Sequence, residues 1–108
     1  MQNLNPEFVR EDGRGKLIQL ITGEFKQINI LEIGKGSYFG GHYHKHKTEW
    51  FYVLSGEVRV NSELYMKGGY FRVDSGNMHT LEAINDSIIV EILSCPYDSK
   101  DIFIEEKE

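Results

Sequence analysis

Three histidines and one glutamate between residues 42 and 49 could together hold a metal ion. His42 and His44 form a His-x-His pair, so in an extended strand both imidazoles project from the same face. Glu49 lies five residues after His44. A loop or bulge over residues 45–48 would let Glu49 begin the next antiparallel strand beside the two histidines. We therefore predict a cluster of nitrogen and oxygen ligands here.

A further candidate ligand, His79, follows a glycine-containing turn at residues 74–77. In a strand it shares one face with Leu81 and Ala83, and an imidazole on an apolar face needs a polar partner, for which a metal is suitable. Three imidazoles and a carboxylate suit Zn²⁺, Fe²⁺, Ni²⁺, Cu²⁺ or Mn²⁺, and ligand type alone does not choose among them. His46 is an alternative ligand or a base facing the substrate.

Short β-rich runs separated by Gly, Asn and Asp turns must position these residues. In the run 25–33, Ile28 and Ile30 alternate with polar residues, as in a half-buried strand. Runs of this kind at a spacing of 8–12 residues are typical of an all-β sandwich or barrel. The expected strands are 17–21, 25–33, 50–54, 58–61, 70–73, 79–84 and 88–93, and the acidic tail 96–108 is expected to be an edge strand or unpaired.

The composition limits the partners of the chain. Its 108 residues suit one domain, and a net charge of −5 disfavours nucleic-acid binding, so we expect a small-molecule substrate or another protein. The single cysteine, Cys95, fits a reducing compartment. There is no run long and apolar enough for a membrane span and no signal peptide pattern, and we predict a soluble, cytoplasmic protein.

Two spaced motifs resemble those of the cupins. The first spans residues 36–56 and the second residues 68–83, with Asp74 where proline is usual and Ala83 where asparagine is usual. The matching positions are Gly36, His42, His44, Glu49 and Gly56 in the first motif, and Gly68, Gly76 and His79 in the second. The resemblance implies a single cupin domain over residues 1–108, an all-β double-stranded β-helix or jelly-roll barrel, with His42, His44, Glu49 and His79 as ligands of one divalent transition metal.

Two further stretches resemble sugar-nucleotide epimerases and ketoisomerases. They are Asp12-Gly-Arg14-Gly15 and the segment from Phe25 to Lys45. The His-x-His segment is most similar to the zinc-binding cupin domain of capsular-polysaccharide epimerases. The resemblance implies zinc and a nucleotide-linked keto-sugar in surface-polysaccharide synthesis. Gly40 replaces an arginine that contacts the anionic substrate in relatives, and the basic residues that could substitute are Arg14, Lys35, Arg59 and Arg72.

Epimerisation or ketoisomerisation needs a base for the proton beside the keto group. A histidine that binds a metal cannot use the same lone pair as a base, so His46, with Tyr38 or Tyr52 as acid, is the expected catalytic set. In a metal-free site, His42 and His44 would instead be the acid and base. Two other functions stay open: a metal-dependent dioxygenase acting on a small organic substrate, and a non-catalytic cupin that binds a small ligand. Small cupins commonly pair, so we also expect a homodimer.

Overall fold

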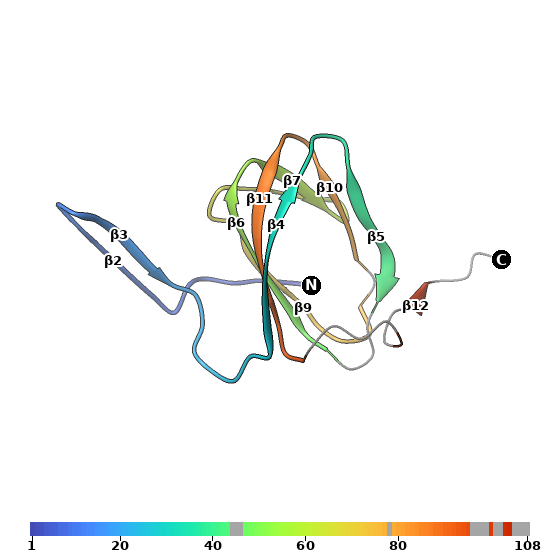
Figure 1. Ribbon diagram of the computed structural model, residues 1–108, viewed down its shortest axis with the longest axis horizontal. Helices are drawn as coiled ribbons and strands as arrows, with labels where there is room; N and C mark the ends of the chain where they lie inside the picture. Colours follow the sequence, from blue (N-terminus) through green and yellow to red (C-terminus); the bar gives the residue numbers. More distant parts are fainter. Residues whose placement is uncertain (44–46, 78, 96–99, 101–102, 105–108) are drawn as a thin grey trace.

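The computed structural model is built almost entirely of β-strands (Figure 1). It describes residues 1–43, 47–77, 79–95, 100 and 103–104, and for residues 39–43 and 103–104 the backbone alone. The strands are β1 (Gln2–Asn3), β2 (Phe8–Asp12), β3 (Gly15–Gln19), β4 (Gln27–Ile33), β5 (Tyr38–Tyr43), β6 (Glu49–Ser55), β7 (Glu57–Val60), β8 (Glu63–Met66), β9 (Tyr70–Val73), β10 (His79–Ala83), β11 (Ser87–Leu93) and β12 (Phe103–Ile104). Over the described residues, no helix has the length and apolarity to cross a bilayer.

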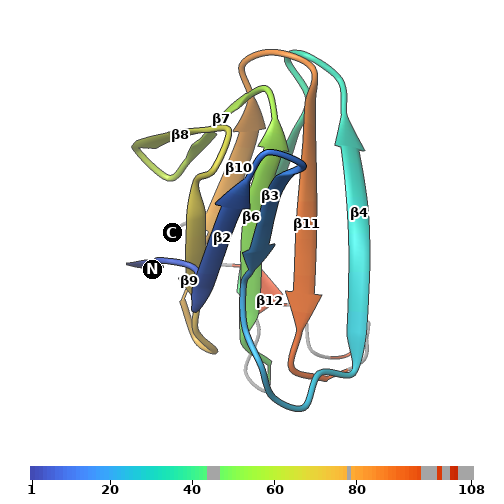
Figure 2. The ribbon, with the colours of Figure 1, turned by 90° about the vertical axis from the view of Figure 1, so that its left-hand side faces the viewer.

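Two five-stranded antiparallel sheets face each other and form the body of the molecule (Figures 1 and 2). The first sheet has the order β1-β9-β6-β11-β4, and the second has the order β12-β5-β10-β7-β8. Because the chain passes repeatedly from one sheet to the other, the arrangement is a jelly roll, which confirms the predicted all-β barrel. The remaining pair, β2 and β3, forms a separate hairpin outside both sheets.

The core lies between the inner faces of the two sheets. Phe51 and Val53 of β6, Leu81 of β10 and Ile89 of β11 are each at most 3% exposed. Phe71 of β9 stacks on Phe51 with ring centroids 5.1 Å apart. The predicted inward face of the strand that begins at His79 is confirmed, because His79, Leu81 and Ala83 are all buried.

The prediction that Ile28 and Ile30 lie on a half-buried face is wrong. They are 62% and 59% exposed, because β4 turns its other face, with Leu31 and Ile33, toward the core. Asn29 shares that inner face and donates a hydrogen bond of 2.8 Å to the Glu91 carboxylate. Burial of Leu31 and Ile33 at the end of the strand therefore sets its orientation and leaves two isoleucines outside.

Gly56 lies where the chain crosses from β6 in the first sheet to β7 in the second. Its φ is +89°, and a Cβ at this position would lie 2.3 Å from Ser87 Oγ and 2.4 Å from the Asp86 carbonyl oxygen. The neighbouring Glu57 N–H donates to Ser87 Oγ at 3.1 Å. Only glycine fits this turn, so the last residue of the first motif holds the two sheets in close contact.

Part of the acidic tail forms the expected edge strand. In β12, Phe103 pairs with Tyr43 and Ile104 pairs with His42 of β5. Residues 96–99, 101–102 and 105–108 of the tail lie outside the described residues. Strands β2 and β8 were missed by sequence reasoning, because the charged run 8–12 and the short run 63–66 carry little apolar alternation.

Candidate metal centre

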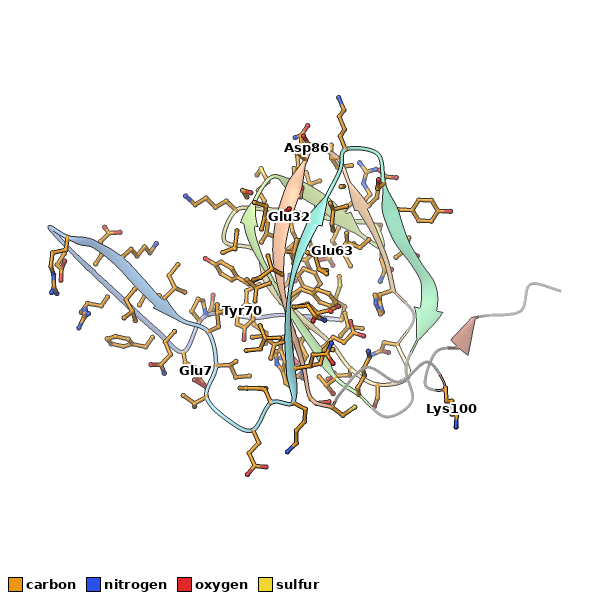
Figure 3. The ribbon with its side chains drawn as sticks, in the orientation of Figure 1. Glu7, Glu32, Glu63, Tyr70, Asp86 and Lys100 are labelled. Carbon is orange, nitrogen blue, oxygen red and sulfur yellow. The ribbon has the colours of Figure 1, made fainter. Side chains whose placement is uncertain are left out.

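Glu49 and His79 meet inside the barrel although they come from different sheets. Glu49 is the first residue of β6 and His79 the first residue of β10, and they are 3% and 6% exposed. His79 Nε2 lies 3.8 Å from Glu49 Oε2. Side chains gather between the two sheets (Figure 3), and the centroid of the Phe51 ring lies 6.1 Å from that of the His79 imidazole. A carboxylate and an imidazole are thus held together in an apolar interior.

The histidine motif approaches this pair through the backbone of β5. His42 is the residue directly opposite His79 in the β5–β10 ladder, and the register shifts between His79 and Thr80. His44 and His46 lie outside the described residues. Glu49 begins a strand, as predicted, but that strand pairs with β9 and β11 rather than with the histidine strand. The candidate centre therefore bridges the two sheets.

Burial changes the acidity of the Glu49 carboxyl. Loss of contact with water is the largest effect, and together with the charge and hydrogen bonding of nearby Glu91 it raises the pKa of Glu49 to about 7. The ammonium group of Lys47 opposes this rise. The pKa of the carboxyl therefore lies close to neutral pH.

Lys47 is a member of the site that sequence reasoning missed. Its side chain is 6% exposed, and its Nζ lies 3.7 Å from Glu49 Oε1. Glu49 thus has a lysine beside one oxygen and a histidine beside the other. A signal was available, because Lys47, Glu49, Phe51 and Val53 follow the alternation of one strand face, which predicts that Lys47 points inward.

The chemistry of these donors fits a metal ion. Two ligands bound to one Zn²⁺ at about 2.0–2.2 Å are roughly 3.0–3.5 Å apart, so the Glu49–His79 pair needs to close by less than about 1 Å. Within the described part of the chain, no three His, Cys, Asp or Glu side chains gather at one point. The prediction that His42 and His44 complete the centre concerns side chains that lie outside those described.

The two tyrosines predicted as acids lie elsewhere. Tyr38 is 68% exposed and pairs with Glu82, four residues along β5 from His42. Tyr52 is buried, but strand alternation places it on the opposite face of β6 from Glu49, where its ring lies 6.1 Å from that of Tyr70. The structure brings neither tyrosine to the Glu49–His79 pair.

The predicted substrate-binding cations are also spread over the molecule. Arg14 is at the tip of the β2–β3 hairpin, 81% exposed, with its guanidinium 2.7 Å from Asp12. It lines an open pocket of about 250 Å³ together with Arg10 and Lys16. The Lys35 N–H donates to Asp86 at 2.8 Å in the turn between β4 and β5. Arg72 pairs with Asp74 at 2.8 Å and stands opposite Trp50 in the sheet.

The two facing sheets form a jelly-roll barrel, the fold of the cupins, and Glu49 and His79 of the two predicted motifs lie side by side within it. The family model described as "Polysaccharide biosynthesis C-terminal domain" matches residues 10–93, and the chain belongs to that family. No curated protein matches the chain.

Solved structures with this fold include several sugar-nucleotide enzymes. The rmlC epimerase of Mycobacterium tuberculosis superposes with a TM-score of 0.80 at 17% identity, over 94% of this chain and 66% of that one. A 3,4-ketoisomerase from Helicobacter canadensis gives a TM-score of 0.79 at 21% identity, and the match covers 96% of this chain and 90% of the ketoisomerase. The ChmJ 3'-monoepimerase from Streptomyces bikiniensis, in complex with dTDP-quinovose, gives a TM-score of 0.76 at 16% identity. That match covers 93% of this chain and 66% of the epimerase. The chain thus spans just under two thirds of the two epimerases.

Proposed function

We propose that this protein is a sugar-nucleotide epimerase or ketoisomerase that acts on a nucleotide-linked keto-sugar in surface-polysaccharide synthesis. The observation that carries the proposal is the buried pair of Glu49 and His79, 3.8 Å apart between the two sheets. Membership of a polysaccharide biosynthesis family and the fold shared with dTDP-sugar epimerases and ketoisomerases support it.

The reaction removes a proton from the carbon next to the keto group and returns a proton to the product. A base that works near neutral pH is needed, together with groups that stabilise the negative charge on the keto oxygen. We assign the base to His46, the histidine of the first motif that is not needed as a ligand. Lys47 holds Glu49 in place from its far oxygen, so that its other oxygen faces His79.

We propose that His42, His44, Glu49 and His79 hold one divalent metal ion, with zinc as the first choice and Fe, Ni, Mn or Cu as alternatives. The donor set and the 3.8 Å spacing of its two described members support this assignment. When bound, the ion would supply a Lewis acid for the keto oxygen.

We further propose a cytoplasmic homodimer. The single cysteine favours a reducing compartment. Arg14, Lys35 and Arg72 remain the proposed contacts for the substrate diphosphate. Arg14 lies on a hairpin that points away from the body (Figure 1), so it would reach a substrate only in the site of a second copy.

The test has two parts, elemental analysis of the purified protein and NMR in D₂O with dTDP-4-keto-6-deoxyglucose. We expect one zinc per chain and deuterium at the carbons beside the keto group. Glu49→Gln should lose the exchange, whereas Glu82→Gln, an exposed glutamate on β10, should keep it. A zinc-loaded protein that incorporates no deuterium would contradict the proposal for this sugar. Bound iron together with oxygen consumption would support the dioxygenase alternative.

A further inference from the structure

Polar side chains cross the inner face of the first sheet, from its edge strand β4 to its middle strand β6. Gln27 and Asn29 lie on β4, Glu91 on the neighbouring β11 and Glu49 on β6. Asn29 and Glu91 stand directly opposite each other in the β4–β11 ladder. Glu91 is opposite Phe51, two residues along β6 from Glu49, so the two glutamates are diagonal neighbours on one face. Figure 2 shows the three strands side by side.

Hydrogen bonds connect these four residues, the polar line, in order across the sheet. The Gln27 amide donates to Asn29 Oδ1 at 3.1 Å, and the Asn29 amide donates to Glu91 Oε1 at 2.8 Å. The pKa of the Glu49 carboxyl is raised first by burial and further by the charge of Glu91 and a hydrogen bond between the two side chains. Glu49 Oε2 lies 3.8 Å from His79 Nε2 of the facing sheet. The polar line therefore ends at the candidate metal centre.

The polar line stands where an apolar residue would support the fold equally well. The next inward positions of the same three strands are Leu31, Val53 and Ile89, which pack in the hydrophobic core. Removing a polar group from water costs free energy even when it finds a partner, and apolar replacements of buried polar groups are often neutral or stabilising. The change from apolar to polar residues beside Glu49 therefore points to a role in the centre itself.

Two groups support Glu49 from different directions. Lys47 Nζ lies 3.7 Å from Glu49 Oε1 and comes from the segment that leads into the same strand. Glu91 reaches Glu49 from the neighbouring strand, and its own position is fixed by the bond from Asn29. A carboxylate held on two sides loses much of its freedom to rotate, so its remaining oxygen stays directed at His79.

We propose that Glu91 is a positioning residue for the metal ligand Glu49, and that Asn29 and Gln27 hold Glu91 in turn. This inference rests on the metal centre of the proposed function and adds to it a set of supporting residues behind one ligand. Groups that hydrogen-bond to a ligand fix its orientation, and loss of one lowers metal affinity by about 10- to 100-fold.

Glutamine can replace Glu91 in this role, whereas leucine cannot. The side-chain oxygen of a glutamine can accept the bond from Asn29, and its NH₂ group can donate to the Glu49 carboxylate. Leucine fills much of the same space on the inner face but makes neither bond. The variants Glu91→Gln and Glu91→Leu therefore separate hydrogen bonding from packing.

The experiment measures the zinc affinity of the full chain by calorimetry against a competing chelator. We expect Glu91→Leu to weaken zinc binding by about 10- to 100-fold, and Glu91→Gln by no more than about threefold. Ile89→Val is the matched control, because Ile89 is fully buried on the same inner face of β11 and packs in the core. It should loosen the core and keep the wild-type zinc affinity. Circular dichroism checks that each variant is folded.

A double-mutant cycle tests the polar line beyond Glu91. Asn29→Leu should weaken zinc binding by about 3- to 10-fold, and adding it to Glu91→Leu should cause no further loss, because Asn29 acts through Glu91. Asn29 is half-buried on the edge strand β4, so its variant keeps the test available if Glu91→Leu does not fold. Wild-type affinity in Asn29→Leu, or additive losses in the double variant, would overturn the polar line.

Bound Co²⁺ reports on the geometry of the centre directly. Its visible absorption depends on the arrangement of its ligands, so Glu91→Leu should shift the bands and Glu91→Gln should keep the wild-type spectrum. An unchanged spectrum and zinc affinity in Glu91→Leu would overturn the inference, as would a Glu91→Gln variant as weak as Glu91→Leu. A wild type that binds no metal would overturn the proposed centre as well. The expected affinities without deuterium exchange would contradict the sugar reaction alone.

Discussion

The inner and outer faces of the first sheet break the rule of polar outside and apolar inside in opposite ways. On the inner side, Glu49 and Lys47 are buried beside Phe51. On the outer side, Ile28 and Ile30 are exposed. Placing a charged group in an apolar interior and an isoleucine in water both cost free energy. Each exception is therefore a useful guide, the first to a candidate chemical site and the second to a candidate contact surface.

The strongest test of the buried Glu49–His79 pair removes one of the two proposed metal ligands. We expect Glu49→Gln and His79→Ala to weaken zinc binding by more than about 100-fold, since loss of a direct ligand exceeds the effect of its supporting residues. Glu82→Gln, the exposed control, should bind as the wild type does. Titration calorimetry against a competing chelator measures the dissociation constants. Wild-type affinity in both ligand variants would show that the metal, if bound, is held elsewhere.

The next largest effect is expected on the free energy of unfolding, for a substitution at Gly56, where the chain crosses between the two sheets. Gly56 and Gly68 both have φ near +89°, but a Cβ would clash only at Gly56, with Ser87 and Asp86. Gly68→Ala should lower the free energy of unfolding by about 1 kcal/mol through backbone strain, whereas Gly56→Ala should lower it by at least about 3 kcal/mol. Urea denaturation measures both. Equal losses of unfolding free energy in the two variants would mean that the two sheets shift at the crossover to make room for the added methyl group.

Ile89 on β11 and Ile30 on the neighbouring β4 allow a direct comparison of the inner and outer faces of the sheet. Ile89→Thr places a hydroxyl at a position with no exposure and should cost about 2–4 kcal/mol of unfolding free energy. Ile30→Thr, at a position 59% exposed, should change it by no more than about 0.5 kcal/mol. Urea denaturation measures both losses. A large loss for Ile30→Thr would show that Ile30 packs within the fold in spite of its exposure.

The pH dependence of the metal-free protein gives the smallest effect. Burial raises the pKa of Glu49 from 4.5 to about 7, so the folded state keeps a proton that the unfolded state releases. The stability that this proton contributes is present below the unfolded pKa and is lost as pH rises to about 7, by at most about 3 kcal/mol. Glu49→Gln should remove this part of the slope and Glu82→Gln should keep it. Thermal unfolding with EDTA at several pH values measures the difference.

Sequence reasoning reached most of the fold because the strands of the barrel have strong local patterns. The turn glycines and the alternation of His79, Leu81 and Ala83 predicted inner faces that the structure confirms. It failed at β4, where Ile28 and Ile30 looked like the inner residues. Both faces of that strand carry large aliphatic residues, so only packing against β11 and the core could decide between them.

Within the site, the sequence supplied candidates but not their arrangement. It selected Glu49 and His79 by spacing, and the structure brings these two together. The roles of His42, His44 and His46, and of the metal, stay predictions. Lys47 was missed because a lysine in a charged run resembles a surface residue until the strand that contains it is seen to point inward.

By itself, the sequence predicted an all-β sandwich or barrel and the candidate ligands, because both depend on local alternation and on the spacing of glycines and histidines. The jelly-roll form was implied by the resemblance to cupins. Only the tertiary structure decided that Glu49 and His79 meet across two sheets, that burial raises the pKa of the Glu49 carboxyl, and that the β2–β3 hairpin stands apart from the body. Those properties depend on distance and burial between residues far apart in the chain. A pattern along one strand carries no information about what the facing sheet places opposite it.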